Sequence, residues 1–140
     1  MENNRTFALI KPGAVKENHY GEIIFLVSQA GFTIKAMRMA KLSLYEAKRF
    51  YRVHEGKEFY ERLTDFMSSG PIVAMVLEKD NAIEDFRKLI GATNPENAAE
   101  GTIRKRFGTT VTKNAIHGAD SPENAVVEWS FFFAEREILE

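Results

Sequence analysis

Two uninterrupted apolar runs constrain the fold of this chain more than any other feature. Residues 6–10 (TFALI) end at Lys11-Pro12-Gly13, and residues 72–77 (IVAMVL) follow Gly70-Pro71. Short apolar runs without alternation, bounded by proline and glycine, are typical of strands that are buried on both faces. Both segments are therefore predicted to be interior strands of a sheet.

Caps and spacing predict helices between and after these strands. Ser43 with Glu46 has the pattern of a capping box, in which each side chain bonds the other residue's backbone at a helix start. Asn81 with Glu84 is predicted to cap another helix, and the segment 120–123 (DSPE) places a capping side chain and a proline at a third start. The predicted helices cover residues 43–54, 59–67, 81–90 and 122–132.

Two further segments complete the pattern. Residues 32–36 alternate like a half-exposed strand, and the alternation slips near Met37, which predicts a bulge. Residues 22–27 (EIIFLV) fit a buried strand or an all-round apolar helix, and Gly21 and Gly31 leave space for a helix, which we prefer. Such a helix needs cover on more than one side, which indicates a subunit interface.

The resulting order of elements is β-α-β-α-β-α-β-α. It favours an α+β, ferredoxin-like fold with an antiparallel four-stranded sheet covered by helices, although the pattern does not fix the strand pairing. The chain has 140 residues, so we expect residues 1–140 to form a single domain.

Composition excludes several classes of function. The formal net charge of −1 argues against nucleic-acid binding driven by overall charge, so an anion site would have to be local. The absence of cysteine excludes disulfides and thiolate chemistry. No apolar run approaches the roughly 20 residues of a membrane span, and residues 1–5 (MENNR) are polar, so we expect a cytoplasmic protein without a membrane partner.

The segment 114–120 (NAIHGAD) contains the clearest candidate for chemistry. His117 ends a short apolar run, Asn114 precedes it by three residues, and Gly118 follows it directly. A glycine beside a reactive side chain is expected to leave space for a bulky charged substrate. A structural histidine satisfied within the core fits the same pattern.

Glu128 is a candidate partner for that histidine. The predicted helix over residues 122–132 carries an apolar stripe of Ala125, Trp129 and Phe132. Glu128 shares the face of this stripe or its edge, and a carboxylate at the rim of a buried stripe usually has a partner. Because the helix follows His117 after a short turn, Glu128 is predicted to approach the imidazole. An exposed position at the helix edge is the alternative.

Four polar residues elsewhere fit a polyphosphate site, namely Lys11, Arg87, Thr93 and Arg104. Each has an ordinary alternative. Lys11 fits a surface lysine with its stem on the core, and Arg87 fits a cation near a helix C-terminus. Arg104 belongs to the charge run 104–106, and Thr93 fits a turn. The chain has no glycine-rich phosphate loop, so discrete side chains would have to hold the phosphates.

Together these segments resemble the nucleoside diphosphate kinase family over essentially the whole chain. The family box N-x-x-H-G-S-D appears here as NAIHGAD at residues 114–120. The other family-like segments are residues 6–12 (TFALIKP), 69–75 (SGPIVAM), 91–95 (GATNP) and 101–104 (GTIR). Several ordered motifs at compatible spacing are far more specific than any one of them.

The resemblance implies a ping-pong exchange. A nucleoside triphosphate, typically ATP, would donate its γ-phosphoryl group to His117, and the phosphohistidine would pass it to a nucleoside diphosphate. Glu128 would orient the imidazole, and Lys11 would complete the catalytic group. The residues implied to bind the nucleotide are Lys11, Tyr51, Phe59, Arg87, Thr93, Arg104, Val111 and Asn114.

Within that set the resemblance also implies separate roles. Tyr51 would lie near the phosphates, Asn114 would contact the ribose, and the base would stack between Phe59 and Val111. Stacking without hydrogen bonds to base edges predicts broad base specificity. Phe59 also begins an apolar helical stripe, so core packing is its alternative role.

The resemblance extends to cofactor and assembly. Mg²⁺ would arrive with the nucleotide, with Asp120 near it through a water. Family members assemble as tetramers or hexamers built from dimers, so a homo-oligomer is implied, and the apolar segment 22–27 is compatible with that.

One position departs from the family box, because Ala119 stands where serine is usual. In relatives that hydroxyl helps to hold the glutamate and the phosphorylated histidine. We expect activity to be retained, with a less well supported phosphohistidine site.

Two other functions fit a chain of this kind. One is a ferredoxin-like module that binds nucleotides or single-stranded nucleic acid without catalysis, although the aromatic-rich strand motif of such modules is missing. The other is a structural or regulatory subunit with a dead site, which the presence of Lys11, Arg104, His117 and Glu128 argues against.

Overall fold

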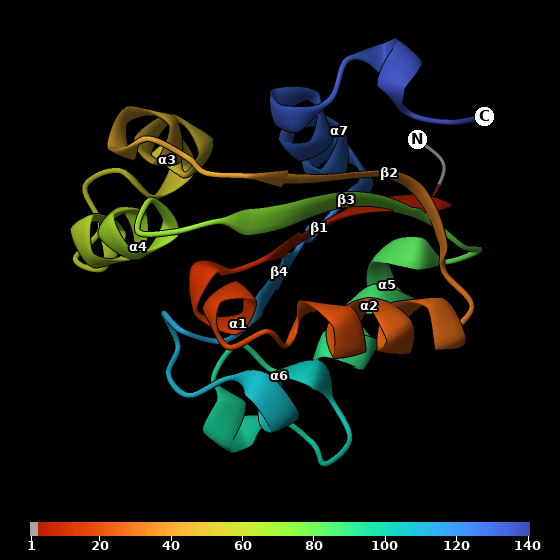
Figure 1. The fold of residues 1–140 in the computed structure, drawn as a ribbon, viewed down its shortest axis with the longest axis horizontal. Helices are drawn as coiled ribbons and strands as arrows, with labels where there is room; N and C mark the ends of the chain where they lie inside the picture. The colour runs from red at the N-terminus through yellow and green to blue at the C-terminus, as the bar shows by residue number, and fades with distance from the viewer. Residues whose placement is uncertain (1–2) are drawn as a thin grey trace.

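The computed structural model describes residues 3–140, in which a four-stranded antiparallel sheet has the order β2-β3-β1-β4 (Figure 1). The strands are β1 Arg5–Ile10, β2 Thr33–Ala40, β3 Ile72–Glu78 and β4 Ile116–Gly118. The α-helices are α1 Pro12–Lys16, α2 Tyr20–Gln29, α3 Leu44–Phe50, α4 Tyr60–Met67, α5 Ala82–Ile90, α6 Ile103–Phe107 and α7 Pro122–Phe132. Short 3-10 helices are η1 Arg52–His54, η2 Pro95–Asn97 and η3 Glu135–Glu137. This architecture confirms the predicted ferredoxin-like α+β fold.

The two apolar runs form the central strands, as predicted. Along β1, Phe7 and Leu9 enter one core cluster with side chains of α3, α4 and α7, whereas Ala8 and Ile10 enter another with side chains of α2 and α5. Successive side chains of a strand point to opposite faces, so an uninterrupted apolar run requires cover on both. Figure 1 shows α7 on one side of the sheet and α2 and α5 on the other. In the part of the chain that is described, no helix is long and apolar enough to cross a membrane.

Helices α3 and α4 form a hairpin beside the sheet. The predicted capping box is present, because Ser43 Oγ accepts from the Glu46 amide and Glu46 Oε1 accepts from the Ser43 amide. The helix ends at Phe50 rather than near His54, and η1 continues the segment.

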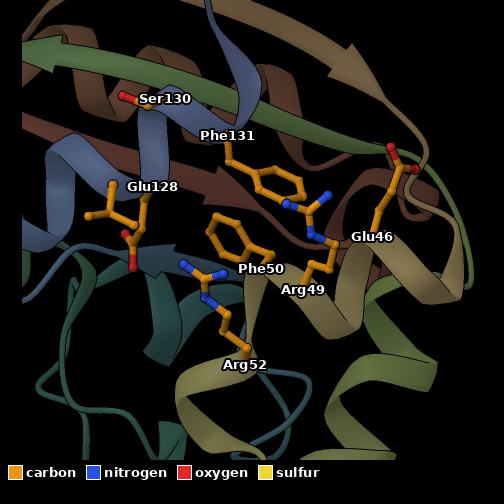
Figure 2. A pocket seen from close by; sticks show the side chains of 8 residues that line it. Glu46, Arg49, Phe50, Arg52, Glu128, Ser130 and Phe131 are labelled. Carbon is orange, nitrogen blue, oxygen red and sulfur yellow. The ribbon is translucent and has the colours of Figure 1, made fainter.

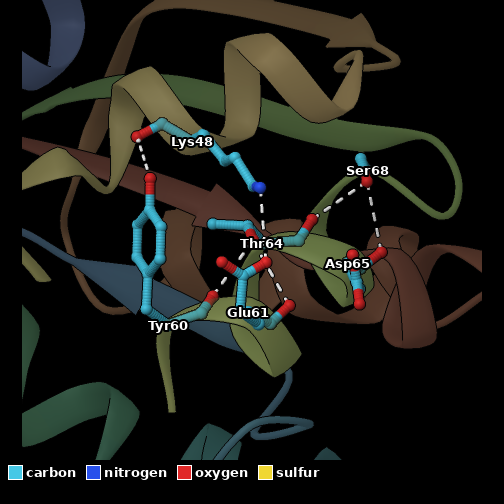
Figure 3. Close-up of polar contacts among 6 residues, drawn as sticks. All are labelled: Lys48, Tyr60, Glu61, Thr64, Asp65 and Ser68. Atoms are coloured by element: carbon cyan, nitrogen blue, oxygen red, sulfur yellow. Dashed lines mark hydrogen bonds and ion pairs between the residues drawn. The ribbon is translucent and has the colours of Figure 1, made fainter. Parts of the chain in front are cut away.

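Polar contacts hold this hairpin together (Figure 3). The Tyr60 hydroxyl donates to the Lys48 carbonyl at 3.0 Å, and the Lys48 ammonium lies 3.3 Å from the Glu61 carboxylate. Within α4, Thr64 and Ser68 donate to carbonyls one turn earlier. The segment between the two helices is thus fixed at both ends.

The start of α5 differs from the prediction. Asn81 has a left-handed backbone (φ 58°), and its side chain forms no capping bond. Its amide instead donates to Asp85 at 3.1 Å. The helix amide of Ile83 donates to Asn3 Oδ1 at 2.9 Å, so a residue from the other end of the sequence supplies the acceptor. Local spacing cannot reveal such a partner.

Strand β2 and the short helices α1 and α6 differ from the prediction, whereas α2 agrees with it. The register irregularity in β2 lies between Ile34 and Ala36 rather than near Met37, and the strand continues to Ala40. Residues 22–27 are helical, as preferred, with Phe25 remaining 60% exposed. Helices α1 and α6 were not predicted, because five residues each are too few to establish helical spacing.

Candidate active site

His117 lies at the middle of β4, where it pairs with Leu9 of β1. Its ring is half-buried, with the rings of Phe7, Phe50 and Tyr51 about it at centroid distances of 6.2, 6.0 and 6.3 Å. The strand fixes the backbone and the aromatic rings restrict the side chain. The imidazole is therefore held in one orientation.

Glu128 of α7 faces this imidazole, as predicted. His117 Nε2 and Glu128 Oε1 lie 2.8 Å apart. A carboxylate only accepts hydrogen bonds, so Nε2 donates and Nδ1 keeps the lone pair. In the neutral imidazole, the pair thus leaves the lone pair of Nδ1 free.

The absence of a side chain at Gly118 allows helix α5 to pack against β4. A Cβ at this position would come within 2.9 Å of the Phe86 ring and 3.1 Å of Ile90, both on α5. Gly118 lines the cavity, but the space left by its missing side chain faces α5. Its missing side chain lets α5 pack closely under the strand that carries His117.

The segment before the histidine is unusual in its backbone. Ala115 has φ 76°, a left-handed conformation that costs about 1 kcal/mol or more for a residue other than glycine. The Ala115 carbonyl accepts from the Lys11 amide at 2.9 Å, which ties the end of β1 to this turn. Asn114 is 2% exposed and donates to the Thr93 carbonyl at 2.9 Å. Among residues 3–140, its Oδ1 atom has no hydrogen-bond partner.

Lys11 is buried rather than a surface lysine. It is 6% exposed, and its ammonium donates to the Thr112 carbonyl at 3.3 Å. Burial, and then the charge of Arg104, lowers the pKa of Lys11 to about 7. A bound anion would oppose both effects and favour the charged form.

Arg104 is buried, unlike its exposed neighbour Arg106 in the charged run 104–106. It is 8% exposed, and its guanidinium donates to the Ile116 carbonyl at 2.9 and 3.2 Å and to the Gly91 carbonyl at 3.0 Å. Burial, and then the charge of Arg87, lowers the pKa of Arg104 to about 10, so it remains a cation at neutral pH. Arg106 is exposed and pairs with Glu22, as expected for a solvated charge run.

All of the predicted residues line one cavity of about 740 Å³. They are Lys11, Tyr51, Phe59, Arg87, Thr93, Arg104, Val111, Asn114, His117, Asp120 and Glu128. Five cationic side chains and the apolar Phe59 and Val111 line this cavity together with the imidazole; the cations are Lys11, Arg52, Arg62, Arg87 and Arg104. The cavity can therefore accommodate a ligand that has an anionic part and an apolar part.

Tyr51 adds a buried donor to this cavity. Its hydroxyl has no partner within the described chain. Burial, and then the charge of Glu128, raises the pKa of Tyr51, so the hydroxyl stays protonated. Asp120 is exposed, and its Oδ1 accepts from the Asn124 amide at 2.6 Å.

Sequence analysis missed some of the lining residues. His54 is one of them, and its ring centroid lies 5.1 Å from that of Phe59 and 6.3 Å from that of Tyr51. Burial, and then the charge of Lys57, lowers the pKa of His54, which favours its neutral form. Arg52, on the same short helix, also lines the cavity. The only available signal was the position of both residues between Tyr51 and Phe59.

A histidine nitrogen with a free lone pair beside several cations suits the acceptance of a phosphoryl group. The fold and the site are thus those expected of a phosphotransferase. No group of three or more potential metal ligands occurs within residues 3–140.

Comparisons with known proteins identify the family. A family model described as nucleoside diphosphate kinase matches residues 4–138. The nucleoside diphosphate kinase of Flavobacterium psychrophilum is 55% identical over 137 residues, which cover 98% of this chain and 99% of the relative. The chain belongs to the nucleoside diphosphate kinase family.

Solved structures agree with this assignment. The nucleoside diphosphate kinase of Aquifex aeolicus matches with a TM-score of 0.95 at 44% identity, covering 97% of this chain and 99% of that one. A halophilic nucleoside diphosphate kinase from Halobacterium salinarum, solved in complex with CDP, matches with a TM-score of 0.93 at 33% identity, covering 99% and 93%.

Proposed function

We propose that this chain transfers the γ-phosphoryl group of a nucleoside triphosphate to a nucleoside diphosphate through a phosphohistidine on His117. The observation that carries the proposal is the bond between His117 Nε2 and Glu128 Oε1, which leaves Nδ1 free in a cavity with Lys11, Arg87 and Arg104. Family membership supports the same reaction.

In the first half-reaction, the Nδ1 lone pair of His117 attacks the γ-phosphorus. The bond from this phosphorus to the β–γ bridging oxygen breaks, and the nucleoside diphosphate leaves with that electron pair. Glu128 stabilises the positive charge that develops on the imidazole by accepting from Nε2. A nucleoside diphosphate then binds, and its terminal β-phosphate oxygen takes the phosphoryl group by the reverse of these steps.

The cations would hold the phosphates during both half-reactions. Lys11 and Arg104 are buried and bonded to backbone carbonyls before a ligand arrives. Donors held in position in advance stabilise a transition state without reorganising at the moment of reaction. Arg87, Thr93 and the Tyr51 hydroxyl would bind further phosphate oxygens.

The apolar part of the cavity would hold the nucleoside. Phe59 and Val111 would lie on opposite faces of the base, so that recognition depends on stacking, and base specificity would be broad. Asn114 Oδ1 would accept a ribose hydroxyl, which suits an acceptor otherwise without a partner among residues 3–140.

Mg²⁺ would enter bound to the nucleotide, as part of the substrate, and would neutralise phosphate charge. The carboxylate of Asp120, exposed at the cavity wall, fits contact through a water. A single carboxylate suits an ion whose other ligands are waters and phosphate oxygens.

Three further expectations accompany this proposal. We propose one domain over residues 1–140 and a cytoplasmic location, which fractionation would test. We also propose a homo-oligomer, a tetramer or hexamer built from dimers, because Phe25, Met37 and Met39 expose 60%, 52% and 54% of their surface. Sedimentation velocity measures that assembly.

The decisive experiment is labelling with γ-labelled ATP and Mg²⁺. Wild-type protein should acquire an acid-labile label that GDP removes, and His117→Ala should acquire none. His19→Ala is a matched control, because His19 lies outside the cavity against Phe107, and it should label normally. Nucleotide binding without label would instead favour the non-catalytic module, and neither binding nor label would favour the structural subunit.

A further inference from the structure

A second hollow adjoins the active-site cavity (Figure 2). Its volume is about 470 Å³, and it lies between α3 and α7. Phe50, Arg52, Val127 and Glu128 line both this hollow and the active-site cavity. Glu128 therefore stands at the boundary, with the imidazole on one side and the second hollow on the other.

The carboxylate of Glu128 is only half satisfied. Oε1 accepts from His117, whereas no hydrogen bond or ion pair from any residue of 3–140 reaches the other oxygen. The side chain is 20% exposed, so a polar group is able to approach that oxygen. A partly buried carboxylate is stabilised by a second partner, above all by a cation.

Arg52 is the side chain placed to supply that partner. It begins η1, and Figure 2 shows its guanidinium directed toward the Glu128 carboxylate, beside the Phe50 ring. Within the described residues it forms no hydrogen bond and no ion pair within 4 Å. Arg49 lines the same hollow, but Figure 2 shows it beside Phe131, and its guanidinium lies 5.8 Å from the centroid of the Tyr45 ring.

We propose that Arg52 is a positioning residue, whose guanidinium binds the free oxygen of Glu128 while the other oxygen holds the His117 imidazole during phosphoryl transfer. This inference rests on the proposed function of His117. As Nδ1 bonds to phosphorus, positive charge develops on the imidazole, and Glu128 must remain ionised and in place. A charge-assisted bond from Arg52 holds the Glu128 carboxylate in the rotamer that bonds the imidazole.

The same pairing affects proton binding by His117. The titratable and charged groups that line the cavity with the imidazole are Lys11 after β1, Tyr51 before η1, Arg52 and His54 of η1, Arg62 of α4, Arg87 of α5, Arg104 of α6, Asp120 after β4 and Glu128 of α7. Removing Arg52 leaves the Glu128 charge less compensated, which favours the imidazolium form. The acidic limb of the pH profile for phosphorylation should then move to higher pH.

The test compares Arg52→Gln, Arg52→Lys and Arg49→Gln with wild type. Single-turnover phosphorylation of His117 by ATP is measured against pH, together with kcat and KM. Arg52→Gln should slow phosphorylation about tenfold and move the acidic limb upward, with KM within about twofold. Arg52→Lys keeps the charge and should recover most of the rate. Arg49→Gln removes the same charge from the same hollow and should match wild type.

Several results would overturn the inference. A rise in KM alone for Arg52→Gln would make Arg52 a phosphate ligand, and an unchanged rate and pH profile would leave it without a role. Equal effects from Arg49→Gln would indicate bulk charge. Thermal melts of all variants exclude a folding defect. If the wild-type protein is not labelled, the proposed function fails. If the wild type is labelled normally and Arg52→Gln behaves like it, only the inference about Arg52 fails.

Discussion

The two ends of the active-site cavity are built in opposite ways. At the end where we propose that the phosphates bind, Lys11 and Arg104 are buried, and each donates to a backbone carbonyl of another segment. At the end where we propose that the base binds, Val53 and Val111 line the cavity and expose 75% and 53% of their surface. One end is fixed before a ligand arrives, and the other offers apolar surface at the rim.

This difference explains how one site would treat many nucleotides alike. Every nucleotide substrate has the same phosphates, so rigid and buried cations suit all of them. The bases differ in their hydrogen-bonding edges but share flat faces, which an aromatic ring contacts without discrimination. Changes at the buried end should therefore affect catalysis strongly, and changes at the rim should affect binding weakly.

The largest effect is expected from Arg104→Gln. The substitution removes a fixed cation, so kcat/KM should fall about 10²- to 10³-fold. It also removes donors to the Ile116 and Gly91 carbonyls, which should lower the free energy of unfolding by about 1–3 kcal/mol. Steady-state kinetics and thermal melts measure the two effects. Arg106→Gln, two residues away and exposed, should be close to wild type in both.

A pH-dependent effect is expected from Lys11. Its pKa is about 7 in the free protein against an ordinary 10.5, and bound phosphates favour its charged form. Nucleotide affinity should therefore weaken as pH rises above about 7, by up to about tenfold per pH unit at the steepest. Titrations with a nucleoside diphosphate at several pH values measure this, and Lys11→Met should flatten the curve.

The same shift gives a signed effect on stability without nucleotide. The folded pKa of Lys11 is depressed, so the unfolded chain binds more protons between pH 7 and 10.5. Stability should therefore rise with pH across that window, relative to Lys11→Met. Equal slopes for the two proteins would show that Lys11 is not desolvated.

A smaller effect is expected at the rim from Phe59→Ala. Base stacking is worth about 1–3 kcal/mol, and a rim position suggests the lower end. KM should rise about fivefold for every base, with little change in kcat. Phe59→Leu keeps the apolar packing and loses the aromatic face, so it separates stacking from a core role. A fall in kcat alone would contradict the division between the two ends.

The smallest effect on turnover is expected from Ala119→Ser. Ala119 is fully buried in the core cluster that includes Ala125 and Phe132. A serine hydroxyl that reaches the Glu128 carboxylate would add about 1 kcal/mol, so the phosphoenzyme should last longer, while kcat changes less than about threefold. Decay of isolated phosphoenzyme measures this. If lifetime, turnover and stability are all unchanged, the hydroxyl is dispensable here.

Features set by local pattern were predictable from the sequence. The runs at residues 6–10 and 72–77 form the central strands, and the Ser43–Glu46 capping box is present. Glu128 reaches His117 because only a short turn separates their elements. The remaining cavity residues were predicted from the resemblance to the family, because none of these residues is specific by itself.

Features set by distant partners were not predictable. Arg104 is buried because the carbonyls of Gly91 and Ile116 meet its guanidinium, and nothing in the run 104–106 indicates this. Gly118 is needed because Phe86 packs against it from α5. Arg52 and His54 line the cavity because of the backbone path of η1. A 3-10 helix of three residues is too short to show a periodic sequence pattern, so the sequence did not predict it.

The bond from the Ile83 amide to Asn3 has a consequence for the order of folding. The two residues are 80 positions apart, so α5 gains this acceptor only once β1 has taken its place beside β3. Forming that contact requires closing a long loop, which favours its appearance late. Arg87 lies on this helix, so the phosphate end of the cavity would be completed only with the last long-range contacts of the sheet.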